Sequence, residues 1–144
     1  MDQPTCPLCA DAAGDVLWRD DFCRVIWVAD ADYPGFCRVI LNAHVQDMTD
    51  LAPADRRRLM DVVFATEAVV RTVLHPDKIN LASLGNMVPH LHWHVIPRFA
   101  DDRHFPDAVW AAPRRGAGCR PQPTEDVRPQ CGALLRQRLG PSLE

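Results

Sequence analysis

The sequence lacks several features that mark specialised classes of protein. No apolar run approaches the roughly 18 residues that a membrane helix needs, so we expect no membrane span. The first residues, MDQPTCPLCADAAGD, contain no basic stretch followed by an apolar one, which argues against a signal peptide and favours a cytoplasmic protein. A net charge of −3 and a pI near 6.0 give no electrostatic reason to expect nucleic-acid binding.

Internal repeats and low-complexity tracts are also missing from the sequence. With 144 residues, 47% of them apolar and 24% charged, the chain has the size and composition of one globular domain with a hydrophobic core. Disulfides seldom persist in the cytoplasm, so we expect the six cysteines to be thiols or metal ligands.

Apolar patterning predicts strands on either side of one long helix. Between residues 54 and 74 apolar residues recur at three- and four-residue spacing, which is typical of an amphipathic helix, and Pro76 ends it. Five segments have the composition of strands: VLWRD, CRVIWVAD, FCRVILNAHV, KINLASLG and HLHWHVIPR. Strands that lead into a helix and then into further strands predict an antiparallel α+β fold.

From Arg103 onward the composition changes. This tail holds six of the thirteen prolines, and seven arginines against four acidic residues. We expect a catalytic domain at residues 1–102, with a Cys-x-x-Cys head, and an extension at 103–144 that packs on the same domain and ends in a short helix near 130–139. His75 and His104 stand beside prolines at the ends of elements, where we expect solvated side chains.

Three of the six histidines stand at alternate positions in the segment HLHWHVIPR. Side chains alternate between the two faces of a strand, so His90, His92 and His94 share one face, opposite an apolar face of leucine, tryptophan and valine. A zinc site built from these three alone is disfavoured. Strand positions two apart are separated by about 6.6 Å, and three ligands from one straight strand hardly fit a tetrahedral shell with bonds of about 2.0–2.1 Å.

Nucleophilic catalysis suits this arrangement better. A neutral imidazole can attack phosphorus when one ring nitrogen donates its proton to a fixed acceptor, which leaves the lone pair of the other nitrogen free. Flanking histidines can orient it and stabilise charge. Gly85-Asn86 lies just upstream, where a turn could bring hydrogen-bond donors to a phosphate.

On these residues the chain resembles the histidine-triad (HIT) family of nucleotide hydrolases and transferases. The hallmark His-x-His-x-His followed by apolar residues is present, Gly85-Asn86 stands at the family's Gly-Gln pair, and Asn80 matches an upstream asparagine. YPGFCRVILNAHV resembles the family's Pro-Gly strand, which ends in a histidine, here His44. The resemblance implies a five-stranded antiparallel sheet, usually in a homodimer.

The resemblance also implies a reaction and its residues. His92 would attack the α-phosphorus of a nucleoside phosphoramidate or dinucleoside polyphosphate, with His90 and His94 in supporting catalytic roles. Asn80 and Asn86 would bind phosphate oxygens, and Asp30 would bind the ribose hydroxyls. Two residues depart from the family pattern: Met87 replaces a serine or threonine, and Phe36 replaces a frequent histidine.

Cys6 and Cys9 could form a redox pair, a zinc site or two ordinary thiols. Only five residues precede Cys6, so the strand that a thioredoxin-type pair follows is missing. Two cysteines need two further ligands to close a structural zinc shell. The resemblance supplies His44 and His90 as those ligands, and we expect a structural zinc ion at the four residues.

Two other functions remain open at this level. A metal-dependent hydrolase using the His-x-His pair would need acidic ligands, for which Asp101 and Asp102 are the candidates. A non-enzymatic nucleotide-binding or zinc-stapled module is favoured by the missing hydroxyl at Met87. Trp110 in the tail is expected to anchor the arm to the body or to a second subunit.

Overall fold

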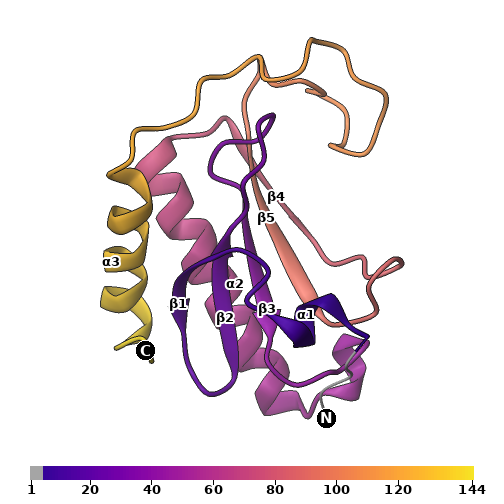
Figure 1. The fold of residues 1–144 in the computed structure, drawn as a ribbon, viewed down its shortest axis with the longest axis vertical. Helices are drawn as coiled ribbons and strands as arrows, with labels where there is room; N and C mark the ends of the chain where they lie inside the picture. Colours follow the sequence, from indigo (N-terminus) through magenta and orange to yellow (C-terminus); the bar gives the residue numbers. More distant parts are fainter. Residues whose placement is uncertain (1–4) are drawn as a thin grey trace.

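The computed structural model describes residues 5–144 and has an α+β fold (Figure 1). Its elements are α1 (Pro7–Ala10), β1 (Asp15–Arg19), β2 (Cys23–Trp27), β3 (Cys37–Leu41), η1 (Met48–Asp50), α2 (Pro53–Leu74), β4 (Lys78–Ala82), β5 (His92–Arg98) and α3 (Val127–Leu139). The five-stranded antiparallel sheet and the long helix confirm the predicted fold class. In the part of the chain described, no helix is both long and apolar enough to span a membrane.

The strands lie in the order β1-β2-β3-β5-β4, so the predicted histidine strand is next to β3 near the centre of the sheet. One face packs against α2 and α3, which lie together beside the sheet in Figure 1. The residues of this face include Val25, Val39 and Val95, all fully buried. The opposite face is covered only in part, by α1 and by the tail.

Helix α2 begins with Pro53 at its first turn, where the missing N–H of proline costs no hydrogen bond. It ends at His75, which has a left-handed φ of 50° and donates its N–H to the carbonyl of Arg71, directly before Pro76. The helix buries six residues toward the sheet: Leu59, Val62, Val63, Thr66, Val69 and Val70. This is the periodic face that the sequence predicts.

The turn between β2 and β3 depends on glycine. Gly35 has a φ of +89°, and a Cβ atom at this position would lie 2.0 Å from the Cδ1 atom of Leu74. Only glycine combines this backbone conformation with so close an approach of α2. The turn therefore fixes where β3 begins and how it lies against the helix.

A buried network joins the tail to the end of β5. Arg98 and Asp102 form an ion pair of 2.8 Å, and both are almost fully buried. Asp102 also accepts hydrogen bonds from the backbone N–H groups of His104 and Phe105. The His104 ring is buried and bonds to the hydroxyl of Tyr33, so the prediction that His104 is solvated is wrong. His75 is exposed, as predicted.

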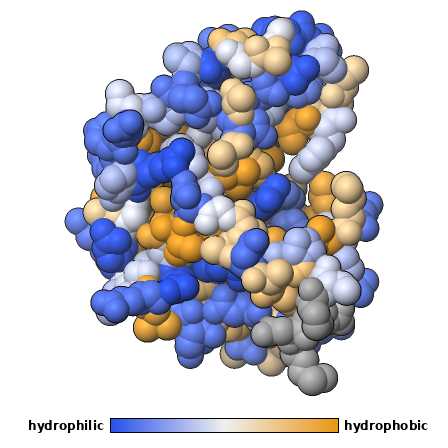
Figure 2. Space-filling model, viewed as in Figure 1, coloured by the Kyte–Doolittle hydropathy of each residue, from blue (hydrophilic) through white to orange (hydrophobic). Residues whose placement is uncertain are grey.

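The last helix belongs to the same hydrophobic core as the sheet. Val127, Cys131 and Leu135 of α3 are buried in one cluster with α2 and β1. The helix starts three residues before the segment that the sequence predicts. The arm that leads to it crosses from β5 to the far side of α2 in Figure 1. Hydrophilic residues cover most of the face seen in Figure 2, and hydrophobic residues show in separate patches between them.

Candidate active site

The histidines lie on the partly covered face of the sheet. In β3 and β5, Ile40 pairs with His92 and Arg38 pairs with His94. Paired residues of an antiparallel ladder share a face, so these four side chains are neighbours. Strand β5 begins at His92, and His90 lies two residues before it. The strand HLHWHVIPR is thus shorter than predicted, while Leu91 and Val95 still face the core.

His92 is held in one orientation by its own strand. The Nδ1 atom lies 2.5 Å from the backbone carbonyl oxygen of His90, which can only accept a hydrogen bond. Nδ1 therefore carries the proton, and Nε2 keeps a free lone pair. The His92 side chain is 9% exposed, and burial lowers its pKa against the opposing effect of this hydrogen bond. A neutral ring with a free Nε2 atom is the form that can attack an electrophile.

His94 lies beside His92, with ring centroids 5.1 Å apart. It stacks on Phe36 at 5.6 Å and meets the edge of Trp110 at 5.7 Å. Burial, with smaller contributions from His92 and Arg38, lowers the pKa of His94 to about 4. The ring is therefore neutral near pH 7 and brings no positive charge to the site, and its Nδ1 atom is buried with no hydrogen-bond partner among the described residues.

Arg38 is a residue of this face that sequence reasoning missed. Its guanidinium lies over the ring of Phe36, with Cζ 5.3 Å from the ring centroid. The Nε atom is buried and has no hydrogen-bond partner. Alternation within FCRVIL places Arg38 on the face of Phe36 and Ile40, which was a usable signal. The sequence could not reveal that Arg38 pairs with His94, because this pairing depends on the register of two strands that are distant in sequence.

A cavity of about 370 Å³ opens beside His94. Its walls include Phe36, Arg38, Arg103 and Trp110, and Asp30 also lines it. Trp110 is 56% exposed and belongs to the arm, so the tail forms one wall of the cavity. The volume lies within the range of small-molecule sites in proteins, roughly 300–1,000 Å³.

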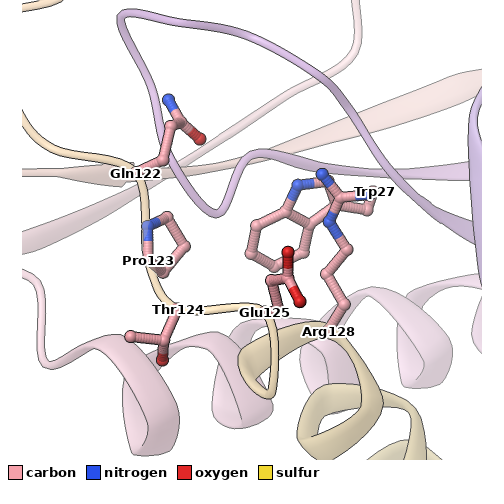
Figure 3. A pocket seen from close by; sticks show the side chains of 6 residues that line it. All are labelled: Trp27, Gln122, Pro123, Thr124, Glu125 and Arg128. Carbon is pink, nitrogen blue, oxygen red and sulfur yellow. The ribbon is translucent and has the colours of Figure 1, made fainter.

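A second cavity, of about 340 Å³, lies on the helical side of the sheet (Figure 3). It is lined by Trp27, by residues 122–125 of the arm and by Arg128, whose guanidinium lies 5.4 Å from the Trp27 ring. Trp27 shares its face with the core rather than with the histidines. No titratable residue of the histidine face lines this cavity, and it is therefore not the candidate catalytic pocket.

The four predicted metal ligands come together. The ligand atoms of Cys6, Cys9, His44 and His90 all lie within 4.8 Å of one another. Cys9 Sγ is 3.3 Å from His44 Nδ1 and 3.4 Å from His90 Nδ1. His90 Nε2 lies 2.6 Å from the carbonyl oxygen of Leu41, so Nε2 carries the proton and Nδ1 faces the sulfurs with its lone pair. Two thiols and two imidazoles at these distances fit a tetrahedral metal ion.

The predicted substrate contacts differ in their surroundings. Asn80 pairs with Ile96 on β4 and β5, and its Oδ1 atom accepts a hydrogen bond of 2.8 Å from Arg98. Asn86 is exposed in the β4–β5 connection, and no hydrogen bond between described residues joins it to the histidines. Met87 in the same connection is 96% exposed.

The two acidic residues considered as ligands of a second metal site form ion pairs with arginines. Asp102 is buried in the ion pair with Arg98, and Asp101 pairs with Arg120 at the surface. Neither carboxylate is available to a metal ion bound by the His-x-His pair. A metal-dependent hydrolase of that kind is therefore disfavoured.

Comparison with known proteins extends these observations. The family profile of the HIT domain matches residues 10–101, well over half of the chain. The AP-4-A phosphorylase of Mycobacterium tuberculosis strain H37Rv is 26% identical over 105 residues, which cover 69% of this chain and 54% of that protein. The chain thus spans about half the length of the curated relatives that it matches.

Solved structures with the same fold are found among bacterial histidine-triad proteins. The protein from Marinobacter aquaeolei VT8 superposes with a TM-score of 0.71 at 26% identity, covering 88% of this chain and 92% of that one. The protein from Sinorhizobium meliloti 1021 gives a TM-score of 0.69 at 26% identity, with 89% and 91% covered. In both comparisons nearly nine-tenths of this chain is covered.

Proposed function

We propose, from the premise that this chain belongs to the HIT family, that it is a nucleotide hydrolase with His92 as its nucleophile. The observation that carries the proposal is the hydrogen bond from His92 Nδ1 to the carbonyl of His90, which leaves Nε2 free to attack. The substrates proposed are nucleoside phosphoramidates and dinucleoside polyphosphates, the second supported by the AP-4-A phosphorylase among its relatives.

The reaction proposed has two steps. In the first, Nε2 of His92 forms a bond to the α-phosphorus, and the bond from phosphorus to the leaving group breaks with its electron pair on that group. In the second, a water oxygen bonds to phosphorus and releases a proton to solvent, the N–P bond breaks, and its electron pair returns to Nε2. The products are a nucleoside monophosphate and the leaving group, which takes up a proton from solvent where its basicity requires one.

We further propose the contacts of the substrate. Asp30 lines the cavity beside His94 and would accept hydrogen bonds from ribose hydroxyls. Since the Asn80 oxygen is engaged by Arg98, its NH₂ group is the part left to donate to a phosphate oxygen. Asn86 would donate in the same way from the exposed connection. His90 supports catalysis through its carbonyl group, and His94 through its ring.

The metal that we propose for the cluster of Cys6, Cys9, His44 and His90 is zinc in a structural role. Four protein ligands close a tetrahedral shell, which leaves no position for water or substrate. When bound, the ion supplies a cross-link between the head and the segment before β5. The ion would fix the ring of His90, and with it the His90 carbonyl group that lies next to His92.

We also propose that the protein is a homodimer. Strand β4 is at the edge of the sheet, and its outer side has no partner strand among the described residues. Phe64 of α2 and Leu84 after β4 are both more than half exposed. An unpaired strand edge favours pairing with a second copy, and exposed apolar side chains favour burial in an interface. Sedimentation analysis should give the mass of two chains, and a monomer at working concentration contradicts the proposal.

The experiment that tests the function is a substrate panel. Purified protein is incubated with adenylyl and guanylyl phosphoramidates, dinucleoside tri- and tetraphosphates, and nucleoside monophosphates as a control. We expect release of a nucleoside monophosphate from at least one of the first two classes, with no loss when a chelator is added during the assay. No release from any of them rules out the proposed hydrolase.

A further inference from the structure

Arg38 is a half-buried cation with nothing to balance it nearby. Its Nε atom is buried without a hydrogen-bond partner, and no ion pair to it is formed by residues 5–144. The other arginine of the same cavity, Arg103, is paired with Asp32 at 2.8 Å. Among the described residues, the carboxylate of Asp30 acts on the charge of Arg38, from beyond ion-pair distance. Desolvating an unpaired guanidinium is costly, and its planar fork of donors matches the oxygens of an anion such as phosphate.

The position of Arg38 points to the reacting phosphate. It pairs with His94 in the sheet and stands diagonally across from His92, on the same face as both. Its charge acts on the two rings together, since it lowers the pKa of each. Arg24 lies on the same face two strands from His92 and donates hydrogen bonds to backbone carbonyls of the head. Because His94 is neutral, Arg38 is the described cation that lies next to the nucleophile without an ion pair.

We propose that Arg38 is a catalytic residue, whose guanidinium binds non-bridging oxygens of the phosphoryl group that His92 attacks. The proposal rests on the proposed function and adds a residue to it. The planar fork of N–H donors matches phosphate oxygens and holds the negative charge that the group carries as the N–P bond forms. Arg38 also supplies polar contact at a site where Phe36 and Met87 supply none.

The test compares binding of a nucleoside monophosphate with binding of the same nucleoside without phosphate. Arg38→Leu places an apolar side chain between Ile26 and His94, its partners across the sheet, so the fold should persist. We expect the affinity for the monophosphate to fall roughly 10- to 100-fold, the size of a lost charged hydrogen-bond pair, with the nucleoside unchanged. Arg38→Lys keeps the charge and should recover part of the loss.

Turnover gives the second measurement. For Arg38→Leu we expect kcat to fall by roughly 10²–10³, as for loss of one donor to a developing oxyanion, and by the same factor for phosphoramidate and polyphosphate substrates. Arg114→Leu is the matched control, because it removes one exposed, paired arginine of the arm outside the cavity. If Arg38→Leu does not fold, Arg38→Met replaces it as the uncharged variant, and its affinity and kcat are compared with those of Arg38→Lys.

Three results overturn the proposal. They are an equal loss of monophosphate and nucleoside affinity, no loss of either, and a wild-type protein that binds the two equally well. A phosphate-dependent, Arg38-dependent affinity without turnover of any substrate supports the anion site and contradicts the hydrolase, so the two failures are distinguishable.

Discussion

The chemistry of the site depends on which nitrogen of His92 carries the proton. A backbone carbonyl cannot donate, so its contact at 2.5 Å fixes the proton on Nδ1 whatever the substrate. The same logic applies at His90, where the carbonyl of Leu41 fixes the proton on Nε2 and turns Nδ1 to the cysteines. Different carbonyl groups thus place the ring proton on Nε2 in His90 and on Nδ1 in His92.

Replacing the nucleophile tests the role of His92. His92→Ala should abolish turnover, a loss of several orders of magnitude, because no neighbouring side chain can take over as nucleophile. His94→Ala should cost less, since His94 supports the reaction without bonding to phosphorus. Both variants should keep the wild-type circular dichroism spectrum. Equal kcat/KM for the wild type and His92→Ala refutes the assignment.

The pH dependence follows from the burial of the histidines. Burial lowers the pKa of His92 below 6.5 and that of His94 to about 4, so both are neutral at pH 7. The value of kcat/KM should therefore stay level below pH 6.5 and fall only as the folded-state pKa of His92 is crossed. The free energy of unfolding should change in the same direction. These histidines do not reduce it above their unfolded-state pKa of about 6.5, and it falls as the pH drops from there toward 4, because the unfolded chain binds more protons than the folded one.

This profile is measured as kcat/KM between pH 4 and pH 8, with the folded fraction followed in parallel. An acidic limb centred at or above about 6.5 contradicts the buried, neutral nucleophile. A rate that stays level throughout, while the protein remains folded, contradicts an imidazole in the rate-limiting step.

At the residue level the sequence predicted the face that the histidines occupy and did not identify Arg38. The alternation of His90, His92 and His94 is local and survives any arrangement of the sheet. Arg38 lies next to the histidines only because β3 and β5 pair in this register. That register depends on the turn at Gly35 and on the length of the connection before β5. The burial of His104 was missed for the same reason, because Tyr33 is distant in sequence.

At the level of elements, the head is tied to the catalytic strand. Helix α1 has only four residues, too few to be stable alone, and its Leu8 packs on Ile26 and Ile40, on the same face of the sheet as the histidines. Zinc at the cluster of Cys6, Cys9, His44 and His90 would add the stability that so short an element lacks.

Cys9→Ser tests this cross-link. We expect a lower melting temperature, loss of about one zinc per chain by elemental analysis, and a moderate decrease in activity, because the His90 carbonyl is less well held. Cys119→Ser, at an exposed cysteine outside the cluster, should change none of these. Well under one zinc per chain in wild-type protein of normal stability means that the cysteines are only thiols.

The sequence predicted α2 almost to the residue, because its periodicity and the following Pro76 indicate these limits. It did not identify Pro53 as the first residue of the helix. It placed the start of β5 two residues too early. The segment at His90 has the composition of a strand, yet its side chain is drawn to the cysteine head and its N–H bonds to Val88. A contact between distant parts of the chain overrides local propensity there.

At the level of the whole molecule, we propose that residues 103–144 fold as one unit with the catalytic domain. The buried Arg98–Asp102 pair begins the arm, Trp110 walls the cavity, and Leu135 of α3 is fully buried in the main core. The sequence indicated an extended arm from its prolines. It could not show that the arm contributes to the site, since this depends on the anchor at Asp102.

Asp102→Ala should weaken the whole fold. Burial alone raises the pKa of Asp102, but hydrogen bonds from Arg98 and backbone N–H groups outweigh this and lower it. Removing the carboxylate leaves Arg98 buried and unpaired, with an expected loss of about 3–5 kcal/mol in unfolding free energy. Asp107→Ala, which breaks an exposed pair with Arg114, should leave the unfolding free energy nearly unchanged, because solvent screens exposed ion pairs. Urea unfolding measures both, and equal losses contradict the anchor.

The central claim is a covalent nucleotide on His92, and the most direct test is to observe it. Wild-type protein is mixed with a substrate from the panel, quenched during the first turnover, and measured by intact mass and peptide mapping. We predict an added nucleoside monophosphate on the peptide that contains His92, formed before free product and missing in His92→Ala. Product release with no adduct at any time, or an adduct that persists in His92→Ala, would contradict the account.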